Sequence, residues 1–219
     1  MSSQSDQKAR SARVMQELRN AYPSATCSLN FSTPLQLLVA TILSAQCTDE
    51  RVNQVTERLF QKYRSAEDFA TADPDELESD IRQTGFFRNK ARNVRGAAAR
   101  MVETFQGEVP RTMDELTTLP GVARKTANVV LGNAYGIVVG IVVDTHVARL
   151  AARLGLTESN DPVQIEQDLM KLFPQTDWLD LSHMLIYHGR AICQARKPMC
   201  TECMLFEWCP TGQATLSGK

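Results

Sequence analysis

Apolar residues recur along the chain in short runs with helical spacing, separated by polar and turn-forming residues. The run Pro34 to Leu43 is apolar nearly all round, which is typical of a helix surrounded by other helices. Amphipathic patterns at 49–63 and 89–105 predict two further helices. The valine-rich stretch 137–143 is the one place where a strand competes. The pattern therefore predicts an all-α fold.

Two helix starts carry their own signals. Asp73 is followed by a proline at the first helical position and by Glu76, which is placed for a capping box. Asp161 and Pro162 repeat the first part of this pattern. The first ten and the last eight residues are polar, so we expect both ends of the chain to be loose.

The composition is that of an ordinary globular protein: of the 219 residues, 43% are hydrophobic and 22% are charged. The longest apolar runs are too short to span a bilayer, and the N-terminal segment lacks the apolar stretch of a signal peptide. We therefore expect a soluble, intracellular, cytoplasmic protein that is monomeric and has no membrane contact.

Charge is small in total but unevenly distributed. A net charge of -1 argues against binding nucleic acid through bulk positive charge, because non-specific affinity comes from neutralising phosphates. Residues 49–80 hold ten acids and four bases, whereas residues 88–100 hold five bases and no acid. The basic run fits a solvated helix face and a phosphate-tracking face equally well. Any surface for nucleic acid must therefore be local.

Four of the six cysteines lie close together near the C-terminus, as Cys193-x6-Cys200-x2-Cys203-x5-Cys209. An intracellular chain keeps its thiols reduced, so metal binding is favoured over disulfides. Structural zinc sites usually pair two short knuckles, and the ferredoxin spacings also differ from this one. From the residues alone, zinc and an iron-sulfur cluster both stay open. We expect Cys27 and Cys47 to be buried thiols outside the site.

A Pro-Gly turn separates two short helical patterns, and Lys125 opens the second. Such a turn lets main-chain N–H groups point at one phosphate whatever the base sequence, and Gly121 permits the close approach. A simple helix-helix connection is the alternative. The helix macrodipole disfavours a positive charge at Lys125, and a lysine nucleophile must be neutral to attack. From position alone, however, a phosphate contact by Lys125 is favoured.

Asp144 ends the valine-rich stretch and precedes a helical pattern, so it is a natural N-cap. A helix N-terminus favours an ionised carboxylate, which is suited to stabilising a positively charged sugar or accepting a proton. The capping and the chemical role are compatible. We interpret His146 as a structural neighbour of Asp144, and His183 and His188 as helix residues with no further role.

Three motifs together resemble endonuclease III and its relatives among the helix-hairpin-helix DNA glycosylases: the turn with its lysine, Val143 to His146, and the cysteine loop. In lyase-competent members, the residue matching Lys125 is the nucleophile and the residue matching Asp144 is its catalytic partner. The family pattern has a second glycine where this chain has Ala123, which can change how the turn sits on a phosphate. The family's terminal cysteines ligate a 4Fe-4S cluster, so the resemblance implies these ligands: Cys193, Cys200, Cys203 and Cys209.

The resemblance, which runs from about Ala21 to Pro210, also implies two helical domains. Residues 27–137 form the one that contains the helix-hairpin-helix. Residues 1–26 and 138–219 form the other, which carries the cluster loop 193–209. The active site is expected in the cleft between them.

An enzyme that acts on a base in duplex DNA must take that base out of the stack, so side chains are needed to fill the gap. Gln46 and Phe86 match family residues that enter it; a polar helix end and a core aromatic are the respective alternatives. We also expect contacts to DNA phosphates from Gly121, Val122, Arg124, Arg196 and Lys197. For Arg196 and Lys197 on the cysteine loop, plain surface charge is the alternative.

The resulting hypothesis is a bifunctional base-excision repair enzyme acting on double-stranded DNA with damaged bases or abasic sites. It would remove oxidised or damaged pyrimidines and cleave the abasic site by β-elimination through a lysine Schiff base. One rival is a monofunctional mismatch glycosylase of the same fold, although such relatives lack this lysine. Others are a non-enzymatic, redox-sensing DNA-binding protein and a zinc-bearing adaptor. No residue identifies the preferred lesion.

Overall fold

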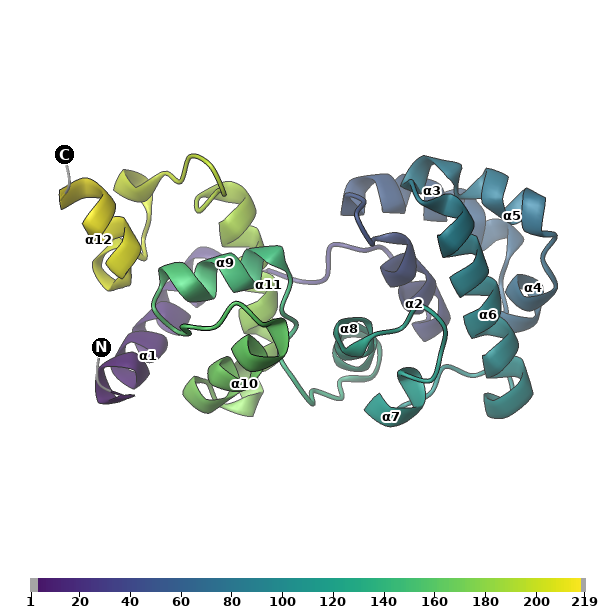
Figure 1. Cartoon of the computed structure of the whole chain (residues 1–219), viewed down its shortest axis with the longest axis horizontal. Helices are drawn as coiled ribbons and strands as arrows, with labels where there is room; N and C mark the ends of the chain where they lie inside the picture. The colour runs from purple at the N-terminus through teal and green to yellow at the C-terminus, as the bar shows by residue number, and fades with distance from the viewer. Residues whose placement is uncertain (1–3, 218–219) are drawn as a thin grey trace. The chain divides into compact units, whose positions relative to one another are not determined.

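The structure, a computed structural model, describes residues 4–217, and all regular secondary structure in that range is helical, with no strand in it. The predicted all-α class is confirmed. Two compact units are present (Figure 1): a continuous unit, Cys27–Val139, and a two-ended unit made of the residues up to Thr26 and from Gly140 onward. Within the described range, none of the helices combines the length and the apolar character that crossing a bilayer requires.

The continuous unit is built around one buried helix. Leu37 to Leu43 of this helix, α2, are all buried, and α2 packs against α3, α6 and α8 (Figure 1). The predicted central helix is confirmed, because a segment that is apolar on every side needs neighbours on every side. The elements of this unit are α2 (Pro34–Leu43), α3 (Asp49–Lys62), α4 (Ala66–Thr71), α5 (Pro74–Asp80), the 3-10 turn η1 (Arg82–Thr84), α6 (Phe87–Phe105), α7 (Met113–Leu116) and α8 (Arg124–Tyr135).

The two helix starts signalled by aspartate and proline are confirmed. Asp73 accepts a hydrogen bond from the main-chain N–H of Glu76 at 2.9 Å, ahead of the proline that opens α5. Asp161 caps α10 (Pro162–Leu172) in the same way. The capping-box role of Glu76 is wrong, because its carboxylate pairs with Lys62 Nζ at 2.6 Å instead.

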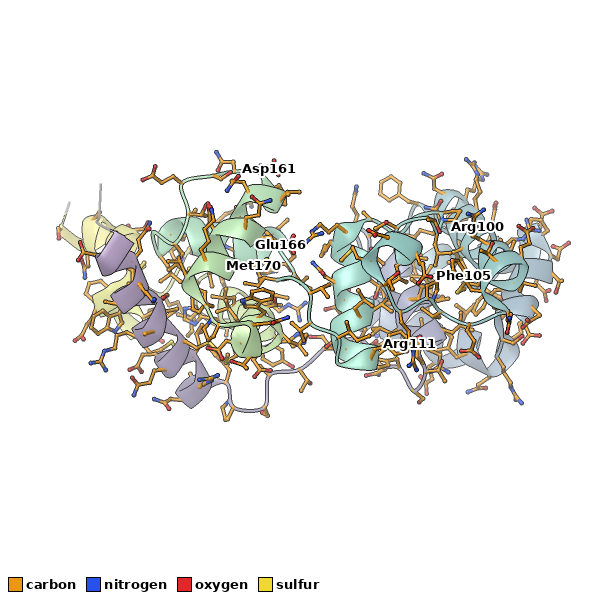
Figure 2. All side chains as sticks on the ribbon, turned by 90° about the horizontal axis from the view of Figure 1, so that it is seen from below. Arg100, Phe105, Arg111, Asp161, Glu166 and Met170 are labelled. Carbon is orange, nitrogen blue, oxygen red and sulfur yellow. The ribbon has the colours of Figure 1, made fainter. Side chains whose placement is uncertain are left out.

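The two-ended unit joins both ends of the chain in one core. Helix α1 (Gln4–Ala21) packs against α10 and α11, and its Val14, Met15 and Leu18 belong to the buried core. Figure 2 shows α10 with Glu166 and Met170 on it and Asp161 at its start. The remaining elements are α9 (Thr145–Arg153), η2 (Gln175–Asp177), α11 (Trp178–Ala191), η3 (Cys200–Glu202), η4 (Phe206–Trp208) and α12 (Pro210–Ser217).

The described residues near both ends of the chain, which we expect to be loose, are helical. Residues 4–10 are the first turns of α1, and residues 212–217 belong to α12. The polar start of α1 is held because the apolar residues that follow it anchor the same helix in the core. Gln7 Nε2 also donates a hydrogen bond to the Gly155 carbonyl at 3.3 Å.

The valine-rich stretch forms neither helix nor strand. Ile141 and Val142 are buried, and the Val142 N–H donates to Ser182 Oγ of α11 at 3.1 Å. The main chain of this segment therefore donates to a helix side chain, where a strand would donate to a neighbouring strand. This extended segment ends at Asp144, directly before α9.

Candidate functional site

Lys125 is exposed in the first turn of α8. Ala123 precedes the helix, and no side chain caps this end. The first N–H groups of a helix have no acceptor within the helix, and its macrodipole attracts anions there. The start of α8 therefore combines an accessible amine with main-chain groups suited to a phosphate.

Close contacts hold the turn before α8 against α6. Gly121 has a φ of +76°, and a Cβ added there would lie 2.7 Å from the Cβ of Asn93. A Cβ on Gly96 of α6 would lie 3.1 Å from Pro120 Cγ. Glycine is thus required at Gly121 both for its conformation and for the close approach to α6.

The turn itself is compact. The Val122 N–H donates to the Leu119 carbonyl at 3.1 Å, and the Val122 side chain is buried. Val122 therefore closes the turn and presents no further donor, whereas the Arg124 side chain is exposed. Ala123 has φ -90° and ψ 171°, an extended conformation open to any residue, so this position does not require the second glycine of the family pattern.

Asp144 caps α9 in the two-ended unit. Its Oδ1 accepts hydrogen bonds from the N–H groups of His146 and Val147, both at 2.8 Å. The capping role is confirmed, and the carboxylate is held in a fixed orientation while staying half-buried.

His146, two residues after Asp144, contacts the arginine that holds the cysteine loop. His146 Nδ1 lies 3.1 Å from Arg149 Nη2, and the same guanidinium group donates to the carbonyls of Gly189 and Cys193 at 3.0 Å. Burial lowers the pKa of His146, which favours its neutral form. The interpretation of His146 as a structural residue fits these contacts.

The two residues expected to enter DNA lie on loops of the continuous unit. Gln46 and Phe86 are both exposed and both have left-handed backbones, with φ of 53° and 46°. Phe86 is 67% exposed, which excludes the alternative of a core aromatic. A large apolar side chain held in solvent by a strained backbone is typical of a contact surface.

The four C-terminal cysteines line one cavity together with Arg153, Phe206 and Gly212. Arg153 Nη1 donates to Cys193 Sγ at 3.2 Å, and the Gly212 N–H donates to Cys209 Sγ at 3.3 Å. In the described part of the chain, no three His, Cys, Asp or Glu side chains are arranged to hold a metal ion.

The chemistry of these four sulfurs suits a centre that contains several metal ions. Burial, together with the charges of the three other cysteines, raises the pKa of the Cys203 thiol to about 11. Thiolates crowded in this way repel one another unless a cationic centre lies among them. The N–H groups that point at Cys193 and Cys209 stabilise negative charge on those sulfurs. The chemistry of the donor set therefore fits a cluster of several metal ions, in which each thiolate binds a different ion, and not a single ion shared by three side chains.

The loop after Cys193 is fixed through its main chain. Arg153 of α9 donates to the carbonyls of Gln194 and Ala195, each at 2.8 Å. Arg196 and Lys197 follow directly, and both side chains are exposed. The loop thus presents two cations on a held backbone, as the sequence suggested.

His188 has a role that the sequence did not reveal. It is buried in α11, its Nε2 lies 3.4 Å from Cys203 Sγ, and its Nδ1 lies 3.0 Å from the Tyr22 hydroxyl. Burial lowers the pKa of His188 to about 4, so the ring is neutral at neutral pH. Because Tyr22 and His188 are far apart in the sequence, no local pattern could have indicated this contact.

Residues 39–175 match the family described as HhH-GPD superfamily base excision DNA repair protein. An endonuclease III from Synechocystis sp. is 61% identical over 208 residues, which cover 95% of this chain and 95% of that protein. The chain belongs to the endonuclease III family. Membership confirms the prediction of a base-excision DNA repair protein and is consistent with a metal cluster at the cysteines.

Two solved structures of endonuclease III are similar to this family member over nearly the whole chain. One is a non-covalent complex with DNA, with a TM-score of 0.92 and 44% identity, covering 96% of this chain and 98% of that one. The other is a trapped covalent intermediate with DNA, with a TM-score of 0.91 and 44% identity, covering 95% and 98%.

Proposed function

We propose that this endonuclease III family member is a bifunctional DNA glycosylase and AP lyase for oxidised or damaged pyrimidines in duplex DNA, with Lys125 as the nucleophile. One observation carries the proposal: an exposed amine stands at the uncapped start of α8, directly after a turn suited to a phosphate. A relative with 44% identity has been trapped in a covalent complex with DNA, which requires a nucleophile on the protein.

The proposed reaction begins with the neutral amine. Lys125 Nζ forms a bond to C1′ of the damaged nucleotide as the bond from C1′ to the base breaks, and the base leaves with the electron pair and is protonated. The nitrogen loses a proton and the sugar ring opens, which gives a Schiff base. A base then removes a proton from C2′ and the 3′ phosphate leaves with the electron pair of the bond from C3′ to oxygen, so the strand is cut on the 3′ side. Water finally hydrolyses the Schiff base, which releases the sugar and restores the Lys125 amine.

Asp144 is the proposed electrostatic partner in this reaction. Its carboxylate is oriented by two N–H groups, so it needs no reorganisation when positive charge develops on the sugar. It can also take the proton that the amine loses. The proposal is that Lys125 and Asp144 act on the same nucleotide.

Exposed groups supply the proposed binding surface. The continuous unit offers Gln46 and Phe86 to fill the gap left by an extruded base. Main-chain N–H groups and cations contact phosphates on both sides of the lesion. The proposed phosphate contacts are Gly121 through the main chain, Val122 as the residue that closes the turn, and Arg124, Arg196 and Lys197 through side chains.

The assay that tests this function uses duplex oligonucleotides with one defined lesion or one abasic site. We expect base release, cleavage on the 3′ side of the abasic site, and a protein-DNA adduct when borohydride is added. Base release without cleavage or adduct would identify a monofunctional glycosylase. Binding without turnover would identify a DNA-binding protein that is not an enzyme. A panel of pyrimidine lesions in the same duplex then ranks the substrates.

We further propose that the cofactor is a 4Fe-4S cluster held by Cys193, Cys200, Cys203 and Cys209. When bound, it supplies a compact cationic centre that gathers four thiolates and so fixes the loop with Arg196 and Lys197. We also propose an intracellular, cytoplasmic location, because that is where a base-excision repair enzyme would meet its DNA.

Changing one ligand tests the cofactor. The purified protein is expected to be brown and to contain about four iron and four sulfide ions per chain. Cys203→Ser should lose the visible absorbance and most of the iron. The matched control is Cys27→Ser, which changes a half-buried cysteine of the continuous unit and should keep both. Colourless wild-type protein with stoichiometric zinc would contradict the assignment.

A further inference from the structure

Lys90 is a buried cation whose hydrogen bonds go to two main-chain carbonyls. The residue lies in α6 and is 4% exposed. Its Nζ donates to the Leu43 carbonyl at 2.8 Å and to the Thr84 carbonyl at 2.7 Å. Burial lowers the pKa of Lys90, so keeping an amine here has a cost in stability that an apolar residue of the same length would avoid.

Both carbonyls end helical segments. Leu43 is the last residue of α2, and Thr84 is the last residue of η1. Carbonyls at helix C-termini lack partners within the helix and carry partial negative charge. The ammonium group of Lys90 therefore caps both segments at once, and a single side chain joins them.

The segments that Lys90 joins lead directly into the two exposed loops. Gln46 follows Leu43 by three residues, and Phe86 follows Thr84 by two. In the described chain, only three non-glycine residues have positive φ, and Gln46 and Phe86 are two of them. Left-handed backbones at such residues persist only where their surroundings hold them. Lys90 provides a fixed point at the root of each loop.

We propose that Lys90 is a positioning residue that sets the spacing between the Gln46 loop and the Phe86 loop, so that both side chains enter the DNA together. This inference rests on the proposed function of those two residues. Lys90 contacts neither DNA nor the reacting atoms; it acts by holding the Leu43 and Thr84 carbonyls. An error of about 1 Å in the placement of such groups can lower a rate by about 100-fold.

The test compares Lys90→Met with wild-type protein on duplex DNA that carries a pyrimidine lesion. Methionine keeps an unbranched apolar stem and removes the donors. We expect kcat/KM for base excision to fall about 10- to 100-fold. The fluorescence rise of 2-aminopurine placed opposite the lesion, which reports the disturbed stack, should fall with it. Borohydride trapping on a single-stranded abasic oligonucleotide, where no gap must be filled, should be retained.

Two comparisons separate positioning from a general effect on the fold. Lys171→Met removes an exposed lysine of α10 in the two-ended unit, which contains neither loop, and should leave excision unchanged. In a Gln46→Ala, Phe86→Ala background, Lys90→Met should change excision less than about twofold, because the groups it positions are absent. The same loss in both backgrounds, or no loss in either, would overturn the inference.

A folding defect is handled by a milder variant. If thermal melting shows that Lys90→Met is unfolded, Lys90→Gln, which keeps an N–H donor, is measured in the same two backgrounds against the same criterion. Trapping by wild-type protein is the separate check on the proposed function. If wild-type protein forms no adduct, the lyase assignment fails independently of what the Lys90 variants do.

Discussion

Replacement of Lys125 by glutamine is expected to abolish strand cleavage at an abasic site and the borohydride-trapped adduct. Without the amine no Schiff base can form, so the rate should fall by at least about 10³-fold. The side chain is exposed, so the free energy of unfolding should change by less than about 0.5 kcal/mol. Gel separation of the cleaved strand and the adduct measures both products directly.

The neighbouring cation provides the control. Arg124→Gln removes the same charge from the same helical turn, and Arg124 is also exposed. It should raise KM and reduce the salt dependence of binding while adduct formation is retained. If Lys125→Gln kept full cleavage and trapping, the nucleophile would have to be another residue.

Asp144→Asn is expected to lower the rate of base excision by about 10²-fold or more. The substitution removes the negative charge that stabilises the sugar, but an asparagine can still accept the hydrogen bonds of an N-cap. Stability should therefore stay within about 1 kcal/mol of wild type. Single-turnover excision rates and thermal melting on the same preparation separate the two effects.

The chain offers a matched control in a second capping aspartate. Asp161 accepts a hydrogen bond from the Val163 N–H at 2.9 Å at the start of α10 and has no proposed role in the reaction. Asp161→Asn should leave both excision and stability close to wild type. Equal activity of the two Asn variants would mean that Asp144 is only a cap.

Local patterns in the sequence were sufficient to predict the helices whose burial and start depend on residues within one or two turns. The all-apolar run of α2 predicts burial on every side, and the aspartates before prolines predict helix starts, because both signals act within one or two turns. The exposed positions of Lys125 and Phe86 also agree with the roles that the family resemblance suggested. Those roles stay predictions, which the Lys125 and Phe86 variants test.

Contacts between distant segments could not be predicted from one sequence. Lys90 lies within a basic run that reads as a solvated or phosphate-tracking face, yet its acceptors are Leu43 and Thr84 in other elements. His188 looks like an ordinary helix residue until the fold brings Tyr22 and Cys203 to it. In each case the sequence contains the donor, but only the tertiary structure identifies the acceptor.

The construction of the two-ended unit also sets the order in which a nascent chain can acquire structure. Helix α1 leaves the ribosome well before its partners α10 and α11, which are synthesised on the order of 10 s later at about 5–20 residues per second. The continuous unit is complete as soon as Val139 emerges, whereas Val14, Met15 and Leu18 lack their partners during this interval. Helix α1 is therefore made before the continuous unit and packed after it, and it is a segment that a chaperone would have to protect during synthesis.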